Sequence, residues 1–324
     1  MTRTLVIGGT GFIGSRVVQR LAADGRSVRC LARTTSRTDR LDNLPVERTV
    51  GDLRDTDSLI RAASGCSSII HLGGISAWSE IDSPDMFPVV VEGTRNVLRA
   101  ALEQKVTRVV YVSSAAAMGP HDRPEPRNEV SPFSERSAVG MRYVLAKRQA
   151  ERLCREAEER GMETVIVRPA EVYGSGDRDM ITASNLVGLL KSSPVVVCAG
   201  GTSVVHIDDV AHGIVRALDQ GRAGETYLLG GDNLLHHELA GLLLELMNRR
   251  TSIISLPGPL LRVCAAAARV FRLPFPIPPA VVPYATRYWF VDNRKARTEL
   301  GLHFRSARET LTETLTWLKT LAIV

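Results

Sequence analysis

Two side chains one helical turn apart carry the clearest chemistry in this sequence. Tyr143 and Lys147 stand four positions apart, so on a helix they share one face. A free tyrosine, with a pKa of about 10, exchanges protons poorly at neutral pH, but a nearby ammonium group favours the phenolate and lowers that pKa. Tyr143 would then protonate a carbonyl oxygen or accept a proton from an alcohol. An exposed tyrosine on an ordinary helix is the competing interpretation.

Two serines follow an apolar run that is typical of a buried strand. Residues 109–112 read Val-Val-Tyr-Val and lead directly into Ser113 and Ser114. In a parallel sheet, ligands bind outside the carboxyl ends of the strands. We therefore expect Ser114 to hydrogen-bond a substrate oxygen and orient it toward Tyr143, and we interpret Ser113 as structural.

A glycine-rich turn near the start of the chain predicts a dinucleotide site. It follows an apolar strand pattern and opens a helical pattern. Its glycines permit a tight turn and a close backbone approach to a pyrophosphate, and the N-terminus of the helix attracts the phosphates. The predicted cofactor contacts in this turn are Gly8, Thr10, Gly11, Phe12, Ile13 and Gly14.

The second predicted strand ends without the carboxylate that usually binds the adenosine ribose of NAD. Arg33 stands at its tip and Arg37 follows shortly after, and a guanidinium group matches the geometry of a phosphate. This pattern predicts a preference for NADP(H), with NAD(H) possible. In a chain so rich in arginine, solvated surface side chains are the alternative interpretation of both residues.

These groups need a scaffold, and the hydrophobic periodicity predicts one of alternating strands and helices. Strands are expected at 4–7, 27–32, 68–72, 108–112 and 164–167, and helices at 12–23, 55–63, 87–104 and 138–160. This alternation is typical of βαβ units with right-handed crossovers. The predicted fold class is α/β, a Rossmann-type doubly wound parallel sheet.

Beyond residue 169 the pattern loosens. Strands are expected at 195–197 and 225–229, and helices at 208–218, 235–247, 260–270 and 310–318. We assign 1–173, with about 204–230, to the dinucleotide-binding domain. About 174–203 and 231–324 form a smaller, mostly helical substrate domain. The apolar, proline-rich segment 256–284 is a roof over a substrate pocket, ordinary core, or a surface that contacts a membrane.

The motifs taken together resemble the extended short-chain dehydrogenase/reductases of the NAD-dependent epimerase/dehydratase family, in the branch of dihydroflavonol reductases and 3β-hydroxysteroid dehydrogenases. The likeness spans almost the whole chain. It rests on the glycine turn at 8–14, Gly51-Asp-Leu53, His71-Leu-Gly-Gly74, Val91–Asn96, Ser113-Ser114, Tyr143 with Lys147, Arg168-Pro169, Val172-Tyr-Gly174, Val205–Val210 and Lys295–Gly301.

The resemblance implies roles for further residues. Ser114, Tyr143 and Lys147 would form the catalytic triad, with Lys147 also holding the nicotinamide ribose. The cofactor would also be contacted by Asp52 and Leu53 at the adenine, by Leu72, Gly73 and Gly74, by Tyr143 and Lys147, and by Pro169 and Val172 at the nicotinamide. Three positions depart from the family pattern: Gly73 and Gly74 replace alanines, Val90 replaces an asparagine, and Ala146 replaces a serine.

The residues directly after Ser114 limit which reactions the predicted site could catalyse. Sugar-nucleotide dehydratases carry an Asp-Glu pair there, whereas this chain has three alanines, 115–117, and so lacks the acid and base of a dehydration. We predict carbonyl reduction or alcohol oxidation on a mainly apolar small molecule. An NAD-dependent nucleotide-sugar epimerase and a non-catalytic, NmrA-like dinucleotide sensor remain as alternatives. Glu171 is interpreted as a surface carboxylate rather than a substrate acid.

Composition limits the partners. The formal charge is +6, and only five of the 41 basic residues are lysines, but the basic residues are scattered, which does not favour nucleic-acid binding. Five widely spaced cysteines favour reduced thiols and a cytoplasmic protein without a metal site. No apolar stretch is long enough to predict stable membrane insertion. By analogy with the family, a homodimer is possible.

Overall fold

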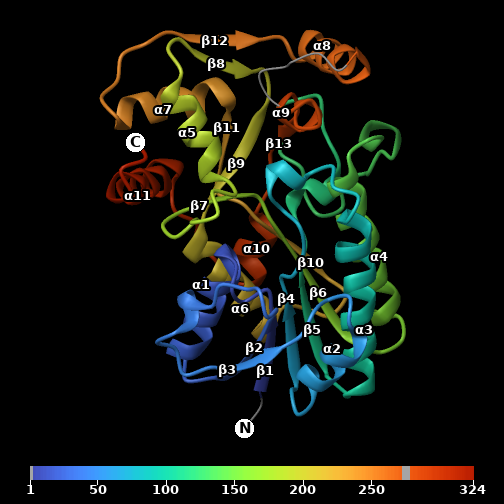
Figure 1. Cartoon of the computed structure of the whole chain (residues 1–324). Helices are drawn as coiled ribbons and strands as arrows, with labels where there is room; N and C mark the ends of the chain where they lie inside the picture. Colours follow the sequence, from blue (N-terminus) through green and yellow to red (C-terminus); the bar gives the residue numbers. More distant parts are fainter. Residues whose placement is uncertain (1–2, 272–277) are drawn as a thin grey trace.

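The computed structural model describes residues 3–271 and 278–324, and its centre is a seven-stranded, entirely parallel sheet (Figure 1). The strand order is β10-β6-β5-β4-β1-β2-β3. The strands are β1 (Arg3–Ile7), β2 (Ser27–Ala32), β3 (Glu47–Val50), β4 (Ser68–His71), β5 (Arg108–Val112), β6 (Glu163–Pro169) and β10 (Thr226–Leu229). The predicted doubly wound parallel sheet is confirmed.

Helices cover both faces of this sheet because its strands are apolar on both sides. Along β5, Val110 packs into one buried cluster and Val109 into the other, as the two-residue period of a strand requires. The first face carries α1 (Phe12–Ala23) and α6 (Ile207–Gln220). The opposite face carries α2 (Thr56–Ala63), α3 (Gly93–Glu103) and α4 (Arg142–Glu158).

A smaller part lies beyond the carboxyl ends of the large sheet (Figure 1). In it, β9 pairs with β7, β11 and β13, while β8 and β12 form a separate two-stranded ribbon. The strands are β7 (Glu171–Tyr173), β8 (Val195–Cys198), β9 (Gly201–His206), β11 (Asp232–Leu235), β12 (Ile253–Leu256) and β13 (Tyr288–Trp289). The helices of this part are α5 (Ala183–Lys191), α7 (His236–Leu246), α8 (Gly258–Phe271), α9 (Val282–Ala285) and α11 (Ala307–Thr320). The helix α10 (Arg294–Glu299) instead packs against β10 of the large sheet.

The structure differs from the sequence-based expectation in several places, and the strand β3 and the helix α5 were not predicted at all. The predicted helix 87–104 opens with a π-helical turn, Pro88–Glu92, before α3. The predicted helix 138–160 begins only at Arg142, because Gly140 has a φ of +79° and interrupts the helical path. The smaller part also contains more strand than predicted: β7, β9, β11, β12 and β13 have two to six residues each, too few to produce a readable period.

Within the described ranges, no helix is both long and apolar enough to cross a bilayer.

Candidate active site

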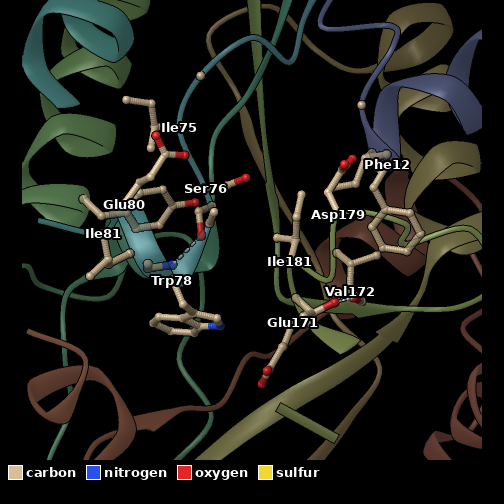
Figure 2. A pocket seen from close by; sticks show the side chains of 18 of the residues that line it. Phe12, Ile75, Ser76, Trp78, Glu80, Ile81, Glu171, Val172, Asp179 and Ile181 are labelled. Carbon is tan, nitrogen blue, oxygen red and sulfur yellow. Dashed lines mark hydrogen bonds between the residues drawn. The ribbon is translucent and has the colours of Figure 1, made fainter. Parts of the chain in front are cut away.

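One continuous cavity of about 1480 Å³ runs along the carboxyl ends of the large sheet and into the smaller part. Figure 2 shows Trp78 and Ile81 on one wall, with Val172 and Ile181 on the other. Every residue that the sequence predicted for cofactor binding or catalysis lines this cavity. They are Gly8, Thr10, Gly11, Phe12, Ile13, Gly14, Arg33, Arg37, Asp52, Leu53, Leu72, Gly73, Gly74, Ser114, Tyr143, Lys147, Pro169 and Val172.

The glycine turn has the geometry of a pyrophosphate cradle. Gly8 has a φ of +85°, which favours glycine, and its carbonyl accepts a hydrogen bond of 3.1 Å from the Gly11 amide. A Cβ on Gly14 would lie 2.0 Å from the Gly8 carbonyl oxygen, so only glycine fits there. No side chain caps α1, which leaves the amides of its first turn available to a phosphate. These residues fit a dinucleotide.

The end of the cavity at which the sequence predicts the adenosine holds Asp52, Leu53 and Arg33. The hydrogen bond from the Arg54 side chain lowers the pKa of Asp52, and the positive charge of Arg33 lowers this pKa further. The Asn96 side chain donates a 2.9 Å hydrogen bond to the Leu53 carbonyl and fixes that loop against α3. Among the described residues, none forms a hydrogen bond or ion pair with the guanidinium group of Arg33, which lines the cavity.

Ionic contacts connect the loop after β2 with the loop after β7. Arg37 forms an ion pair with Asp179, and Arg178 forms one with Asp39. Arg40 donates 3.0 Å hydrogen bonds to the carbonyls of Thr10 and Gly176. Sequence reasoning missed Arg40 and Asp179, because nothing distinguishes them from other charged loop residues before the two loops are brought together.

Ser113 and Ser114 have different surroundings. Ser114 is the residue before the short 3₁₀ turn Ala115–Met118, and its Oγ accepts a 3.2 Å hydrogen bond from the Ala116 amide. Ser113 is buried, and its Oγ donates a 2.7 Å hydrogen bond to Glu151 Oε1. Both serines line the cavity, but the hydroxyl of Ser113 is committed to Glu151.

The pKa of Tyr143 is shifted in the direction opposite to our expectation. Burial raises this pKa, and a hydrogen bond with Ser114 opposes the rise. The expected lowering by Lys147 is not found, because the cost of removing the phenolate from water exceeds what the Ser114 hydrogen bond returns. Tyr143 therefore keeps its proton throughout the neutral range.

Lys147 is one turn further along α4 and is buried. Its Nζ donates a 3.1 Å hydrogen bond to the Val112 carbonyl and lies 5.3 Å from the centre of the Tyr111 ring. Burial lowers the pKa of Lys147 to about 8, and the charge of Glu151 opposes that shift. The ammonium group is thus held at the carboxyl end of β5, close to its point of deprotonation.

A buried ion pair anchors α4 to the sheet. Arg168 on β6 donates to Glu151 through Nε (2.8 Å) and through Nη2 (2.6 Å), and both side chains are almost fully buried. Arg168 and Ser113 together hold the pKa of Glu151 below its usual value, although burial alone would raise it. Sequence reasoning missed Glu151, whose position four residues after Lys147 was the available signal.

His71 lies beneath this part of the cavity as a neutral ring. Burial and the charge of Lys147 lower the pKa of His71 to about 3. Thr94 Oγ1 donates to the Val90 carbonyl (2.6 Å) and so accepts from His71 Nε2 (3.1 Å). Among the described residues, His71 Nδ1 has no hydrogen-bond partner.

The half of the cavity that borders the smaller part, where we expect the substrate, is mainly apolar and has one polar cluster. Trp78, Leu239, Leu256, Val281, Tyr284 and Trp289 are among its lining residues. Glu171 also lines it and is not the surface carboxylate that we expected. Glu171 Oε1 accepts hydrogen bonds of 2.7 Å from Tyr173 and from Asn185. His236 also lines the cavity. Burial lowers the pKa of His236, and the charge of Glu171 partly opposes that shift.

The described residues contain no group of three or more His, Cys, Asp or Glu side chains that could hold a metal ion. Part of the predicted roof, residues 272–277, lies outside the described residues. The neighbouring Leu256, Leu261, Val281 and Tyr284 do line the cavity.

Comparison with known proteins agrees with this geometry. A putative dihydroflavonol 4-reductase of Synechocystis sp. is 31% identical, with 96% of this chain and 93% of the relative covered. The 4-hydroxy-2-methyl-3-oxo-4-farnesyl-3,4-dihydroquinoline-1-oxide ketoreductase of Stigmatella aurantiaca is 28% identical over 92% and 91% of the two chains.

A solved structure, the dTDP-glucose 4,6-dehydratase DesIV of Streptomyces venezuelae with NAD and TYD bound, superposes with a TM-score of 0.80. It is 26% identical, and 98% and 97% of the two chains are covered. Residues 4–230 match the model of the NAD dependent epimerase/dehydratase family. The resemblance inferred from the motifs is thereby confirmed: this chain belongs to the NAD dependent epimerase/dehydratase family.

Proposed function

We propose that the protein is an NADPH-preferring oxidoreductase that interconverts a carbonyl and an alcohol on a mainly apolar small molecule. The observation that carries this proposal is the convergence of Ser114, Tyr143 and Lys147 on the cavity that also contains the glycine turn. Reductase and ketoreductase names among the relatives support the same reaction class.

The protonation of Tyr143 suits it to donate a proton. Because burial raises the pKa of Tyr143, its hydroxyl stays protonated until a carbonyl oxygen develops negative charge. Ser114 donates a hydrogen bond to that oxygen, and Lys147 holds the nicotinamide ribose. When bound, the reduced dinucleotide supplies the hydride that adds to the carbonyl carbon. The alcohol product then contains the Tyr143 proton on its oxygen.

The cofactor preference is assigned to Arg33. Its guanidinium group lines the cavity without a hydrogen bond or ion pair from any described residue, so a 2′-phosphate would not displace an existing partner. Arg37 is already paired with Asp179 and contributes less. NAD(H) remains usable, in keeping with the family, because the glycine turn recognises the pyrophosphate that both cofactors share.

The substrate is assigned an apolar body with one hydrogen-bond donor, such as a hydroxyl group. Aromatic and aliphatic walls would bury the body. Glu171 Oε1 already accepts two hydrogen bonds, whereas among the described residues none donates to Oε2. A substrate hydroxyl group would satisfy that oxygen. Glu171→Gln should therefore raise KM for ketones that bear a distal hydroxyl more than for the matching ketones without it, and an equal change for both would contradict this assignment.

Calorimetric titration of the purified protein with NADPH and NADH, followed by a screen of apolar ketones and alcohols, tests the proposal. Tyr143→Phe should bind NADPH as the native protein does and lose about a hundredfold to ten-thousandfold in kcat. Full activity of this variant would refute the mechanism. NAD retained through purification, with turnover of nucleotide sugars and no net cofactor consumption, would instead identify an epimerase. Cofactor binding without turnover of any compound would favour a dinucleotide sensor.

A further inference from the structure

Large apolar side chains gather on one end of the molecule. Eleven of them are exposed on the described part of the chain, and six of these lie on β8, β12 and α8. They are Val196, Ile254, Leu260, Val263, Val270 and Phe271. These three elements occupy the end of the molecule opposite the N-terminus, with α8 at its margin (Figure 1).

The solvent-facing side of α8 is apolar at every position whose side chain the structure describes as exposed. Its described exposed positions are 259, 260, 263, 264, 266, 267, 270 and 271, and none carries a charged side chain. Val263 is 68% exposed and Phe271 is 70% exposed, whereas Ala265 and Ala268 on the inner side are buried. A surface helix normally shows the reverse arrangement, and a contiguous apolar patch usually marks an interaction site.

The segment that carries most of this patch has charges of one sign. Residues 246–291 contain six arginines and no aspartate or glutamate, and of these six Arg287 forms an ion pair with Asp122. Arg262 donates 3.2 Å hydrogen bonds to the carbonyl and Oγ1 of Thr286, and such neutral partners leave its charge uncompensated. Arg250, just before β12, is exposed. An apolar strip beside Arg262 and Arg250, which have no ion-pair partner among the described residues, complements a surface with an apolar interior and an anionic exterior.

The patch is continuous with the active-site cavity. Val196 on β8, Leu256 at the end of β12 and Leu261 on α8 all line that cavity, and Val196 pairs directly with the exposed Ile254 in the ribbon. The ribbon that carries part of the patch thus also forms part of the cavity wall.

We propose that α8 and the β8–β12 ribbon dock on an anionic lipid bilayer, with α8 lying in the interface plane. A second copy of the chain is a poorer occupant, because a twofold contact through this patch would bring the two sets of arginines together. This docking does not depend on the reaction assigned above, since it follows from the exposed surface alone.

Sedimentation of the full chain with lipid vesicles tests the proposal. The native protein should bind vesicles of phosphatidylcholine mixed with phosphatidylglycerol, bind pure phosphatidylcholine more weakly, and be partly released by added salt. Val263→Glu and Arg250→Glu should each weaken partitioning at least about tenfold. Val130→Glu provides the matched control, because Val130 is 86% exposed outside the patch and its replacement should change nothing.

Val263→Glu removes apolar surface and adds a negative charge, Arg250→Glu reverses a charge, and unchanged circular dichroism would verify that each variant is native. Absence of native binding to the anionic vesicles would overturn the proposal, as would equal binding of all three variants. A native dimer that Val263→Glu dissociates, with vesicle binding unchanged, would show that a second copy covers the patch and would also overturn it.

Discussion

Arg168 holds both carboxylate oxygens of Glu151, one helical turn beyond Lys147 on α4. The same carboxylate accepts a hydrogen bond from the hydroxyl group of Ser113. This buried contact joins the helix that carries Tyr143 and Lys147 to the strands β5 and β6, so the position of the proposed proton donor depends on an ion pair that does not itself contact the substrate.

Removing one member of this pair should destabilise the protein. Glu151→Gln leaves the guanidinium group of Arg168 buried without a counter-charge, which should cost about 3–5 kcal/mol in the free energy of unfolding. Urea denaturation followed by circular dichroism measures it. The double variant Glu151→Met with Arg168→Met should lose less than either single methionine variant, because it leaves no unpaired charge. A double variant that loses the sum of both would contradict this account.

Two glycines in the cofactor site should respond differently to the same change. Gly14→Ala should abolish NADPH binding, because its Cβ would lie 2.0 Å from the Gly8 carbonyl oxygen. Gly74→Ala should be tolerated, because its Cβ would lie 3.6 Å from Val90 Cγ2 and 3.8 Å from Lys147 Nζ. The second variant should gain about 0.4–1 kcal/mol in unfolding free energy through a less flexible unfolded chain. Calorimetry with NADPH, together with thermal unfolding, distinguishes the two.

Arg33 and Arg37 should contribute unequally to cofactor choice. Arg33→Asp removes the unpaired guanidinium group and places a carboxylate near the 2′ position, so the ratio of NADPH to NADH affinity should fall about ten- to hundredfold. Arg37→Asp should change that ratio less, because Arg37 is paired with Asp179. Arg123→Asp, at an exposed site outside the cavity, serves as the charge control. An unchanged ratio of NADPH to NADH affinity in Arg33→Asp would mean that Arg33 does not bind the 2′-phosphate.

The pH dependence of reduction should reflect Lys147. Its pKa of about 8 predicts that kcat/KM is constant at lower pH and falls above about 8, where the ammonium group loses its proton. Lys147→Arg stays protonated throughout, so any residual activity should lack this fall. A native profile that stays flat to pH 10 would contradict the assignment.

The same lowered pKa has an effect of definite sign on stability. The native state binds the Lys147 proton less tightly than the unfolded chain, in which the pKa has its ordinary value of 10.5. This residue's contribution to the unfolding free energy therefore rises as the pH increases from about 8 to about 10.5. Below pH 8 both states are protonated, and the unfavourable burial of the charge is constant.

Most of the large sheet could be predicted from sequence because its central strands and its helices have strong periods, whereas the edge strand β3 was missed. The predicted bounds of α1, β2 and β5 coincide with the observed ones. The short strands β7 and β13, with three and two residues, depend on pairing with β9, so no local pattern reveals them. All the predicted site residues line one cavity because strand ends and adjoining loops meet at one edge of a parallel sheet.

What the sequence could not supply were pairings between distant side chains. Glu151 with Arg168 and Arg37 with Asp179 are separated by 17 and 142 positions, and their charges are ordinary until the fold joins them. The direction of the Tyr143 pKa shift was missed for a related reason, since it depends on how much water the folded chain excludes. Side-chain spacing alone contains no information on that quantity.

The chain leaves the large sheet after β6 and returns to it only at β10, some 57 positions after Pro169. During synthesis, β6 is therefore an unpaired edge strand of the sheet until the ribosome has made the first strands of the smaller part and then β10. A fragment that stops at Pro169 would keep that edge permanently, with its backbone groups available to pair with other molecules. Neither part of the fold is therefore encoded by one contiguous stretch of the gene.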